Sequence, residues 1–91
     1  MIRVIWTSAA EKKRDAALDY IAVDNVRAAF GQLSEIERQT DLLMEQPNMG
    51  RPGKVKGTRE LVIRHTPFIV VYRVKEDVVQ IVRFLHSAQN R

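Results

Sequence analysis

The chain has no cysteine, which excludes disulfide bonds, thiolate zinc sites and cysteine nucleophiles. It also has no apolar run that approaches the roughly 18 residues needed for a membrane-spanning helix. The N-terminus, MIRVIWTSAAEKKRD, turns polar too early for a secretory signal peptide. Together these absences predict a cytoplasmic protein with no membrane partner.

Metal and nucleotide motifs are missing as well. The two histidines stand in no H-x-x-E or H-x-H pattern, and no Asp or Glu lies at ligand spacing near them. The glycines at 50, 53 and 57 lack the Gly-Lys-Ser/Thr ending of a phosphate-binding P-loop. No internal repeat or low-complexity segment interrupts the 91 residues. We therefore expect no metal, no cofactor and one domain over residues 1–91.

Positive charge is abundant, but it lies in one half of the chain. Residues 51–91 carry nine Lys and Arg against three Asp and Glu, a formal charge of +6. Residues 1–50 carry six Lys and Arg against eight Asp and Glu, a formal charge of −2. A basic half beside an acidic half indicates a polyanionic partner, for which RNA or DNA is the natural candidate.

The first half of the sequence predicts a strand followed by two helices. Residues 2–7 are rich in β-branched and aromatic side chains, which is typical of a strand. Ser8 opens an S-x-x-E capping box, so a helix is expected to begin there and to run to about residue 22. Asp24 or Asn25 is expected to cap a second helix, whose apolar stripe should face a core. The stripe consists of Val26, Ala29, Phe30, Leu33, Ile36, Thr40 and Leu43.

The second half predicts a loop and then three strands. The loop over residues 46–57 is rich in Gly, Pro and basic residues, and the strand-like runs cover 58–64, 68–75 and 78–85. Short connections imply an antiparallel meander. The order β-α-α-β-β-β predicts an α+β fold in which a helical hairpin packs on one face of a twisted, mainly antiparallel sheet. Both faces of the last two strands are apolar, so a binding partner is expected to cover the second face.

The meander brings four basic residues toward one end of the sheet. Arg64 and His65 lie where the first meander strand ends, and Arg83 and His86 lie where the third ends, which runs in the same direction. Two histidines for proton transfer and two arginines for a phosphate would suit metal-free cleavage of RNA at its 2′-hydroxyl. The alternative is a pair of partly exposed histidines on turns, with no catalytic role.

A second basic set lies on and after the Gly/Pro loop and consists of Arg51, Lys54, Lys56 and Arg59. Glycine lets backbone approach a phosphate and Lys or Arg neutralises its charge, so these residues are candidates for binding a nucleic-acid backbone. The alternative is a solvated loop whose charges contribute only solubility. Trp6 and Tyr72 are candidates for stacking on bases, although their apolar strand positions favour core packing.

The order of elements, the G-R-P-G loop and the phrases GTRELVIRHTPFIVVYRV and VVQIVRFLH together resemble the RelE/ParE superfamily of bacterial toxins. The resemblance covers nearly the whole chain and is most specific over residues 50–86. It implies the toxic half of a type II toxin–antitoxin pair, with a cognate antitoxin as its partner in a hetero-oligomer.

The resemblance also implies two kinds of target. RelE-like members enter the ribosome and cut mRNA, whereas ParE-like members poison DNA gyrase and cut nothing. The sequence departs from many RelE-like members because Ile69 stands where they carry an arginine. On the four basic residues at the strand ends, we predict a ribosome-dependent mRNA endoribonuclease that arrests translation. The alternatives are a gyrase inhibitor without catalytic activity, and a toxin-fold remnant that only binds its antitoxin and represses its operon.

Overall fold

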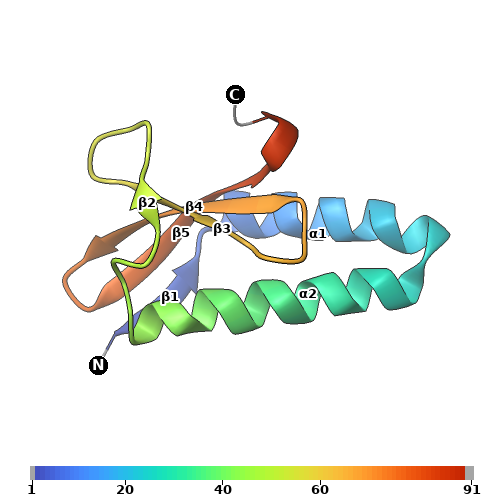
Figure 1. The fold of residues 1–91 in the computed structure, drawn as a ribbon, viewed down its shortest axis with the longest axis horizontal. Helices are drawn as coiled ribbons and strands as arrows, with labels where there is room; N and C mark the ends of the chain where they lie inside the picture. Colours follow the sequence, from blue (N-terminus) through green and yellow to red (C-terminus); the bar gives the residue numbers. More distant parts are fainter. Residues whose placement is uncertain (1, 90–91) are drawn as a thin grey trace.

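The structure, a computed structural model, describes residues 2–89 and has the predicted α+β architecture. A helical hairpin packs on one face of a five-stranded mixed sheet (Figure 1). A two-residue strand that the sequence did not predict precedes the three meander strands. In chain order the elements are β1 (Arg3–Trp6), α1 (Ser8–Asp24), α2 (Val26–Asp41), η1 (Leu42–Met44), β2 (Arg51–Pro52), β3 (Arg59–Val62), β4 (Phe68–Lys75), β5 (Val78–His86) and η2 (Ser87–Gln89).

The sheet has the strand order β1-β5-β4-β3-β2. Every neighbouring pair is antiparallel except β1 with β5, so the first strand joins the last in parallel, with Trp6 opposite Ile81. Two backbone hydrogen bonds mark the limits of this pairing. Arg3 N donates to Asp77 O over 2.9 Å, and Thr7 N donates to Ile81 O over 3.0 Å. Beyond that point β5 continues without β1 beside it.

A β-bulge interrupts the pairing of β4 with β5. Val71 lies opposite Arg83, but the next β4 residue lies opposite Ile81, so Val82 is the extra residue on β5. A bulge breaks the strict alternation of side chains between the two faces. Ile81 and Phe84 therefore both enter the core, where they are 0% and 5% exposed, and Arg83 points to the face opposite the helices.

The core lies between the hairpin and the sheet, and Tyr72 is one of its largest fully buried side chains. The Tyr72 hydroxyl accepts a hydrogen bond from Gly50 N at 2.9 Å and donates one to Pro47 O at 2.7 Å. Burial raises the pKa of this phenol. The favoured prediction of core packing is thus confirmed for Tyr72, which ties the start of the Gly/Pro loop to the middle of β4.

The cap of α1 differs from the expectation. Thr7, not Ser8, is the N-cap: its backbone is extended and its Oγ1 accepts a hydrogen bond from Ala10 N at 3.2 Å. Pairing with β5 holds Thr7 in the extended conformation that an N-cap requires, so Ser8 becomes the first helical residue. The second cap is confirmed, since Asn25 Oδ1 accepts from Ala28 N at 2.9 Å.

Replacing Thr7 with alanine is expected to lower the free energy of unfolding by about 1 kcal/mol, because a backbone N–H at the helix start loses its acceptor. Ser8→Ala is the matched control and should change stability by less than about 0.5 kcal/mol, since Ser8 is an exposed helical residue. Urea unfolding followed by circular dichroism measures both variants. Equal losses from the two substitutions would contradict the assignment of the cap to Thr7.

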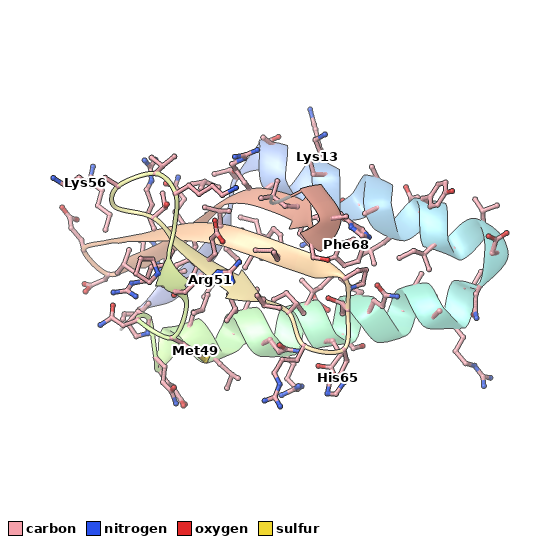
Figure 2. The ribbon with its side chains drawn as sticks, turned by 45° about the horizontal axis from the view of Figure 1, so that its top comes forward. Lys13, Met49, Arg51, Lys56, His65 and Phe68 are labelled. Carbon is pink, nitrogen blue, oxygen red and sulfur yellow. The ribbon has the colours of Figure 1, made fainter. Side chains whose placement is uncertain are left out.

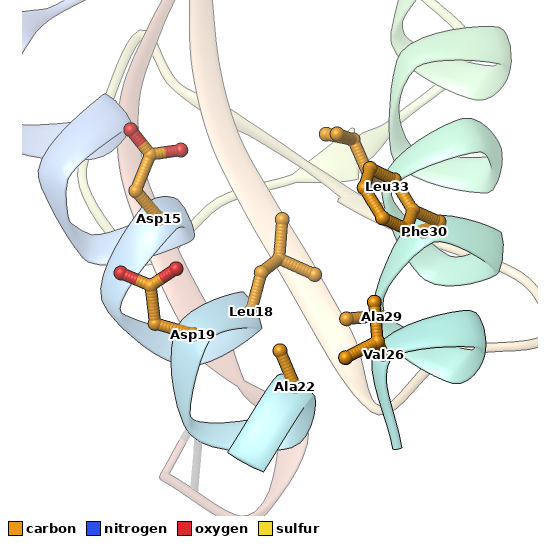
Figure 3. Close-up of a pocket in the computed structure, with 8 residues that line it drawn as sticks. All are labelled: Asp15, Leu18, Asp19, Ala22, Val26, Ala29, Phe30 and Leu33. Carbon is orange, nitrogen blue, oxygen red and sulfur yellow. The ribbon is translucent and has the colours of Figure 1, made fainter.

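The stripe predicted for the second helix faces the core only in part. Ile36 and Leu43 are fully buried, but Val26 and Phe30 are 57% and 66% exposed, so the prediction is wrong for these two residues. The reason is geometric: the hairpin extends beyond the end of the sheet, and its first α2 turns meet α1 alone (Figure 1). An apolar groove between the helices results, with Asp15 on one wall (Figure 3).

Candidate functional site

The sheet face opposite the helices carries a groove, here called the outer groove. The loop after β2 forms one side of it and strands β3, β4 and β5 form its floor. Backbone hydrogen bonds close the loop, with Gly53 N donating to Thr58 O over 2.8 Å. The lining residues are Lys54, Val55, Thr58, Glu60, Val71, Arg73, Val82, Arg83 and Leu85. The outer groove therefore combines an apolar floor with the cations of Lys54, Arg73 and Arg83.

The acidic member of the outer groove, Glu60, is 6% exposed and is held by Arg51. Arg51 Nε and Nη2 both donate to Glu60 Oε1, over 3.2 Å and 3.0 Å. A buried carboxylate needs such a partner, because desolvation of an uncompensated charge is costly. The pair aligns β2 with β3, where Arg51 lies directly opposite Glu60. The charge of Arg51 is thus largely matched within the chain.

The other residues of the predicted nucleic-acid-binding set divide into two kinds. Arg59 Nη1 donates to Gly50 O over 2.8 Å, so this guanidinium supports the loop backbone. Lys54 and Lys56 are exposed on the loop, and Lys56 projects near its tip (Figure 2). Only Lys54 of the two lines the outer groove. A role of all four residues in binding nucleic acid stays a prediction.

The end of β5 and the residues that follow β3 lie at the same end of the sheet, as the sequence predicted. Phe68 lies opposite His86 on β5, and on its other side Ile63 N donates to Phe68 O over 2.9 Å. His86 and Ile63 therefore flank Phe68 at the same end of the sheet, about 10 Å apart, which is two strand spacings. Arg64 and His65 follow Ile63 directly, in the turn to β4.

That turn is directed toward α2. Gln39 makes two hydrogen bonds with the backbone of Arg64. Arg64 N donates to Gln39 Oε1 over 2.7 Å, and Gln39 Nε2 donates to Arg64 O over 2.8 Å. His65 has a φ of 69° and lies beside α2 (Figure 2). Hydrogen bonds from Gln39 and Arg38 lower the pKa of the Glu35 carboxyl, and the charge of His65 adds a smaller effect in the same direction. The imidazole of His65 is therefore next to the acidic side of α2.

The other two members of the predicted catalytic set point elsewhere. Arg83 lines the outer groove, on the face opposite the helices. His86 lies on the helix-facing side, with its ring edge-on to Phe68 at 5.9 Å between centroids and with Nδ1 accepting from Ala88 N at 3.2 Å. The expected convergence is therefore wrong for Arg83, because Arg83 and His86 are three positions apart on β5 and alternation places them on opposite faces of the sheet. The catalytic roles of all four residues stay predictions.

Of the residues that line the outer groove, the predicted sets included only Lys54 and Arg83. Among those that sequence reasoning missed are Glu60, Arg73 and the bulge residue Val82. Arg73 follows Val71 by two positions on β4, so strand alternation alone places both on one face. Arg73 Nε donates to Gln80 Oε1 over 2.8 Å across the strands. No signal in the sequence marks the bulge or the burial of Glu60, since both depend on the neighbouring strands.

Two further findings concern metals and membranes. Among residues 2–89, no three His, Cys, Asp or Glu side chains are grouped closely enough to hold a metal ion. Neither described helix combines the length and the apolar character that crossing a membrane requires.

Comparison with known proteins agrees with this architecture. The sequence model of the family described as "ParE toxin of type II toxin-antitoxin system, parDE" matches residues 4–91. The chain belongs to this family. The RelE/ParE resemblance of the sequence is thereby confirmed, and with it the type II toxin assignment.

Individual relatives support the same assignment. Protein Y4kP of Sinorhizobium fredii is 39% identical over 87 residues, which cover 96% of this chain and 90% of Y4kP. Toxin RelE2 of Caulobacter vibrioides is 34% identical over 89 residues, which cover 98% and 99%. The chromosomal ParDE system from P. aeruginosa superposes with a TM-score of 0.82 at 30% identity, covering 94% of this toxin and 96% of that chain. YafQ from E. coli has a TM-score of 0.63 at 12% identity, covers 98% and 97% of the two chains, and shows the shared fold alone.

Proposed function

We propose that this toxin inhibits DNA gyrase by binding it, without cutting RNA. The observation that carries this choice is the separation of the predicted catalytic set: Arg83 on one face of the sheet, His65 beside α2 and His86 against Phe68. General acid–base catalysis needs its groups within about 3 Å of the same reacting atoms. Groups on opposite faces of a sheet do not meet that condition.

The family supports the same choice. ParE-like members of the superfamily poison gyrase, and the ParE family model matches nearly the whole chain. The resemblance to RelE-like nucleases is weaker at Ile69, which replaces their arginine and is 3% exposed on the outer face. A buried aliphatic side chain at that position contributes no charge toward a phosphate.

The second candidate function is ribosome-dependent cleavage of mRNA. The outer groove favours it, because Lys54, Arg73 and Arg83 gather there and such cations suit the charge of a scissile phosphate. In that mechanism Arg83 and Arg64 hold the phosphate, and His86 and His65 move protons. Translation would stop when the ribosome-bound message is cut.

A cognate antitoxin is the partner under either function. Solved neighbours include the chromosomal ParDE toxin–antitoxin system of P. aeruginosa and the E. coli DinJ–YafQ complex. An antitoxin that covers the cationic outer groove would meet Lys54, Arg73 and Arg83 with carboxylates, since complementary charge steers association. The toxin then reaches its target only when the antitoxin is removed.

One pair of assays tests the choice of target. Purified toxin is added to gyrase during supercoiling of relaxed plasmid, and in parallel to a cell-free translation reaction whose mRNA is mapped by primer extension. We expect inhibited supercoiling and uncut mRNA, and addition of the antitoxin should restore supercoiling. Specific cuts in translated mRNA with unaffected gyrase would overturn the proposal and favour the second function.

The loop lysines should contribute to the encounter with the target rather than to stability. Lys54→Ala combined with Lys56→Ala is expected to weaken target inhibition about fivefold, which corresponds to about 1 kcal/mol for two exposed charges. The double variant should also show a shallower dependence of inhibition on salt, because rim charges act by screened steering. Lys12→Ala combined with Arg27→Ala removes two exposed charges outside the outer groove and serves as control. Identical salt slopes for the two variants would mean that the loop lysines are merely solvated.

A further inference from the structure

The loop between β2 and β3 stands clear of the sheet and has a well-defined conformation (Figure 1). At its base Gly53 N donates to Thr58 O over 2.8 Å, which continues the pairing of β2 with β3 as a narrow two-stranded ribbon. Nearer its tip Thr58 N donates to Val55 O over 3.1 Å, and Gly57 adopts a φ of 86°, which suits glycine. The loop is therefore organised before any partner binds.

The tip of this loop presents an apolar side chain between two cations. Lys54 and Lys56 are exposed, and Val55 between them is 66% exposed. Residues 46–59 contain no Asp or Glu, so no neighbouring carboxylate in the loop reduces this positive charge. The tip is thus suited to a partner that offers anionic groups on both sides of an apolar surface.

The charges at the tip continue into the outer groove through Arg73 and Arg83. Among residues 2–89, Lys54, Lys56, Arg73 and Arg83 are in no ion pair, whereas the acidic residue of the groove, Glu60, is paired with Arg51. Four unmatched cations therefore lie on the loop and the groove beside it. Such a surface attracts a polyanion.

The lining of the groove and the position of Lys56 favour a nucleic-acid duplex. No aromatic side chain is among the described residues of the groove lining, and single strands are held by aromatic rings on which their bases stack. In a duplex the bases already stack on one another. Lys56 does not line the groove, so a peptide lying in the groove would not reach it, whereas a duplex is wide enough to contact both the groove and the loop tip.

The shape of the loop favours DNA over RNA. The major groove of B-DNA is about 12 Å wide and admits a two-stranded β-ribbon. The major groove of an A-form RNA duplex is too narrow for side chains to read. The exposed methyl groups of Val55 also suit the base edges of B-DNA, where thymine presents a methyl group.

We propose that the β2–β3 loop enters the major groove of the duplex DNA that gyrase holds. Lys54 and Lys56 then contact phosphates on the two sides of the groove, Val55 meets base edges, and Arg73 and Arg83 contact the flanking backbone. This deepens the proposed function and rests on it for the presence of gyrase. The toxin acts on the complex of enzyme and DNA, and the phosphate contacts carry no sequence preference.

The first test measures binding of full-length toxin to a fluorescent thirty-base-pair DNA duplex of mixed sequence by anisotropy at several salt concentrations. We expect a Kd of about 10⁻⁴–10⁻⁶ M, the usual range for contacts without sequence preference. Lys54→Ala combined with Lys56→Ala should make the plot of log K against log salt shallower by about 1.8, because each lost phosphate contact contributes about 0.9. Lys12→Ala combined with Arg27→Ala removes the same charge elsewhere and should leave the slope unchanged.

Val55→Ser gives an independent readout, because an apolar contact does not depend on released counterions. We expect this change to weaken DNA binding about threefold with no change in the salt slope. Val23→Ser is the matched control: Val23 is 84% exposed at the end of the helical hairpin, far from the loop, and its change should leave the Kd within about twofold. Equal effects of the two serine variants would contradict the assigned contact of Val55.

The remaining outcomes separate this proposal from the proposed function. Equal salt slopes for the two double variants would overturn the DNA contact, as would tighter binding of duplex RNA or single-stranded DNA of the same sequence. Wild-type toxin that inhibits supercoiling but does not bind the duplex would also overturn it and would leave gyrase inhibition standing. Binding to the duplex without inhibition of supercoiling would support the DNA contact and contradict only the proposed function.

Discussion

Gly50→Ala is expected to lower the free energy of unfolding by about 3 kcal/mol, the upper part of the usual range for overpacking. A Cβ at this position would lie 2.8 Å from Glu60 O and equally close to Cε1 and Oη of Tyr72. The backbone must then shift, and the hydrogen bond from Gly50 N to the Tyr72 hydroxyl is strained or lost. Loss of this contact would also loosen the loop that forms one side of the outer groove.

The matched control, Gly31→Ala, is expected to change the free energy of unfolding in the opposite direction. Gly31 is an exposed residue of α2, and a Cβ there meets nothing within 4 Å. Gly31→Ala should therefore raise the free energy of unfolding by about 0.5–1 kcal/mol, because alanine has the higher helix propensity. Urea denaturation of the two variants and wild type measures the difference. A Gly50→Ala variant as stable as wild type would contradict the close contact with Tyr72.

Arg83→Ala is expected to reduce target inhibition about thirtyfold, the loss of about 2 kcal/mol that is typical of an arginine hot spot. Arg83 is the charged residue that lines both the outer groove and a second hollow, which lies between β5 and the N-terminal turns of α1. Its side chain is exposed, so the free energy of unfolding should change by less than about 0.5 kcal/mol. Inhibition curves for supercoiling, read beside urea unfolding, measure both effects.

The histidines separate the two candidate functions in the same experiment. For a toxin that acts by binding, His65→Ala and His86→Ala should each change inhibition only a few-fold, far less than Arg83→Ala. For an RNA-cutting toxin, loss of one proton-transfer group lowers the rate by about 10²–10⁴. Arg27→Ala, an exposed change on α2 outside the groove, controls for net charge. A hundredfold loss from His86→Ala with intact folding would contradict the binding mechanism.

Local sequence signals predicted the fold well, because periodicity and turn residues report on backbone conformation directly. The first strand, both helices, Asn25 as a cap and the three-strand meander all follow from such signals. The failures occur where distant segments decide the outcome. Pairing with β5 makes Thr7 the cap in place of Ser8, and the limited length of the sheet leaves Phe30 exposed.

The candidate site was predictable in composition but not in arrangement. The basic character of Lys54 and Arg83 could be read from the sequence, and both line the outer groove. The burial of Glu60 with Arg51 as its partner could not, because a two-residue strand with no propensity signal brings them together. The bulge has the largest consequence: one extra residue in β5 decides that Arg83, and not His86, lies on the outer face. The separation of these two residues follows from strand alternation alone, since they are three positions apart.

The parallel pairing of β1 with β5 also determines the stage of synthesis at which the toxin can fold and become active. β1 is made well before its partner β5, so the long segment between Trp6 and Val78 must be closed into one loop before the pair forms. β5 also carries Arg83, so a nascent chain that ends before it has neither a finished sheet nor the cationic surface. We therefore expect protease resistance and toxicity to appear together, only after β5 has been made.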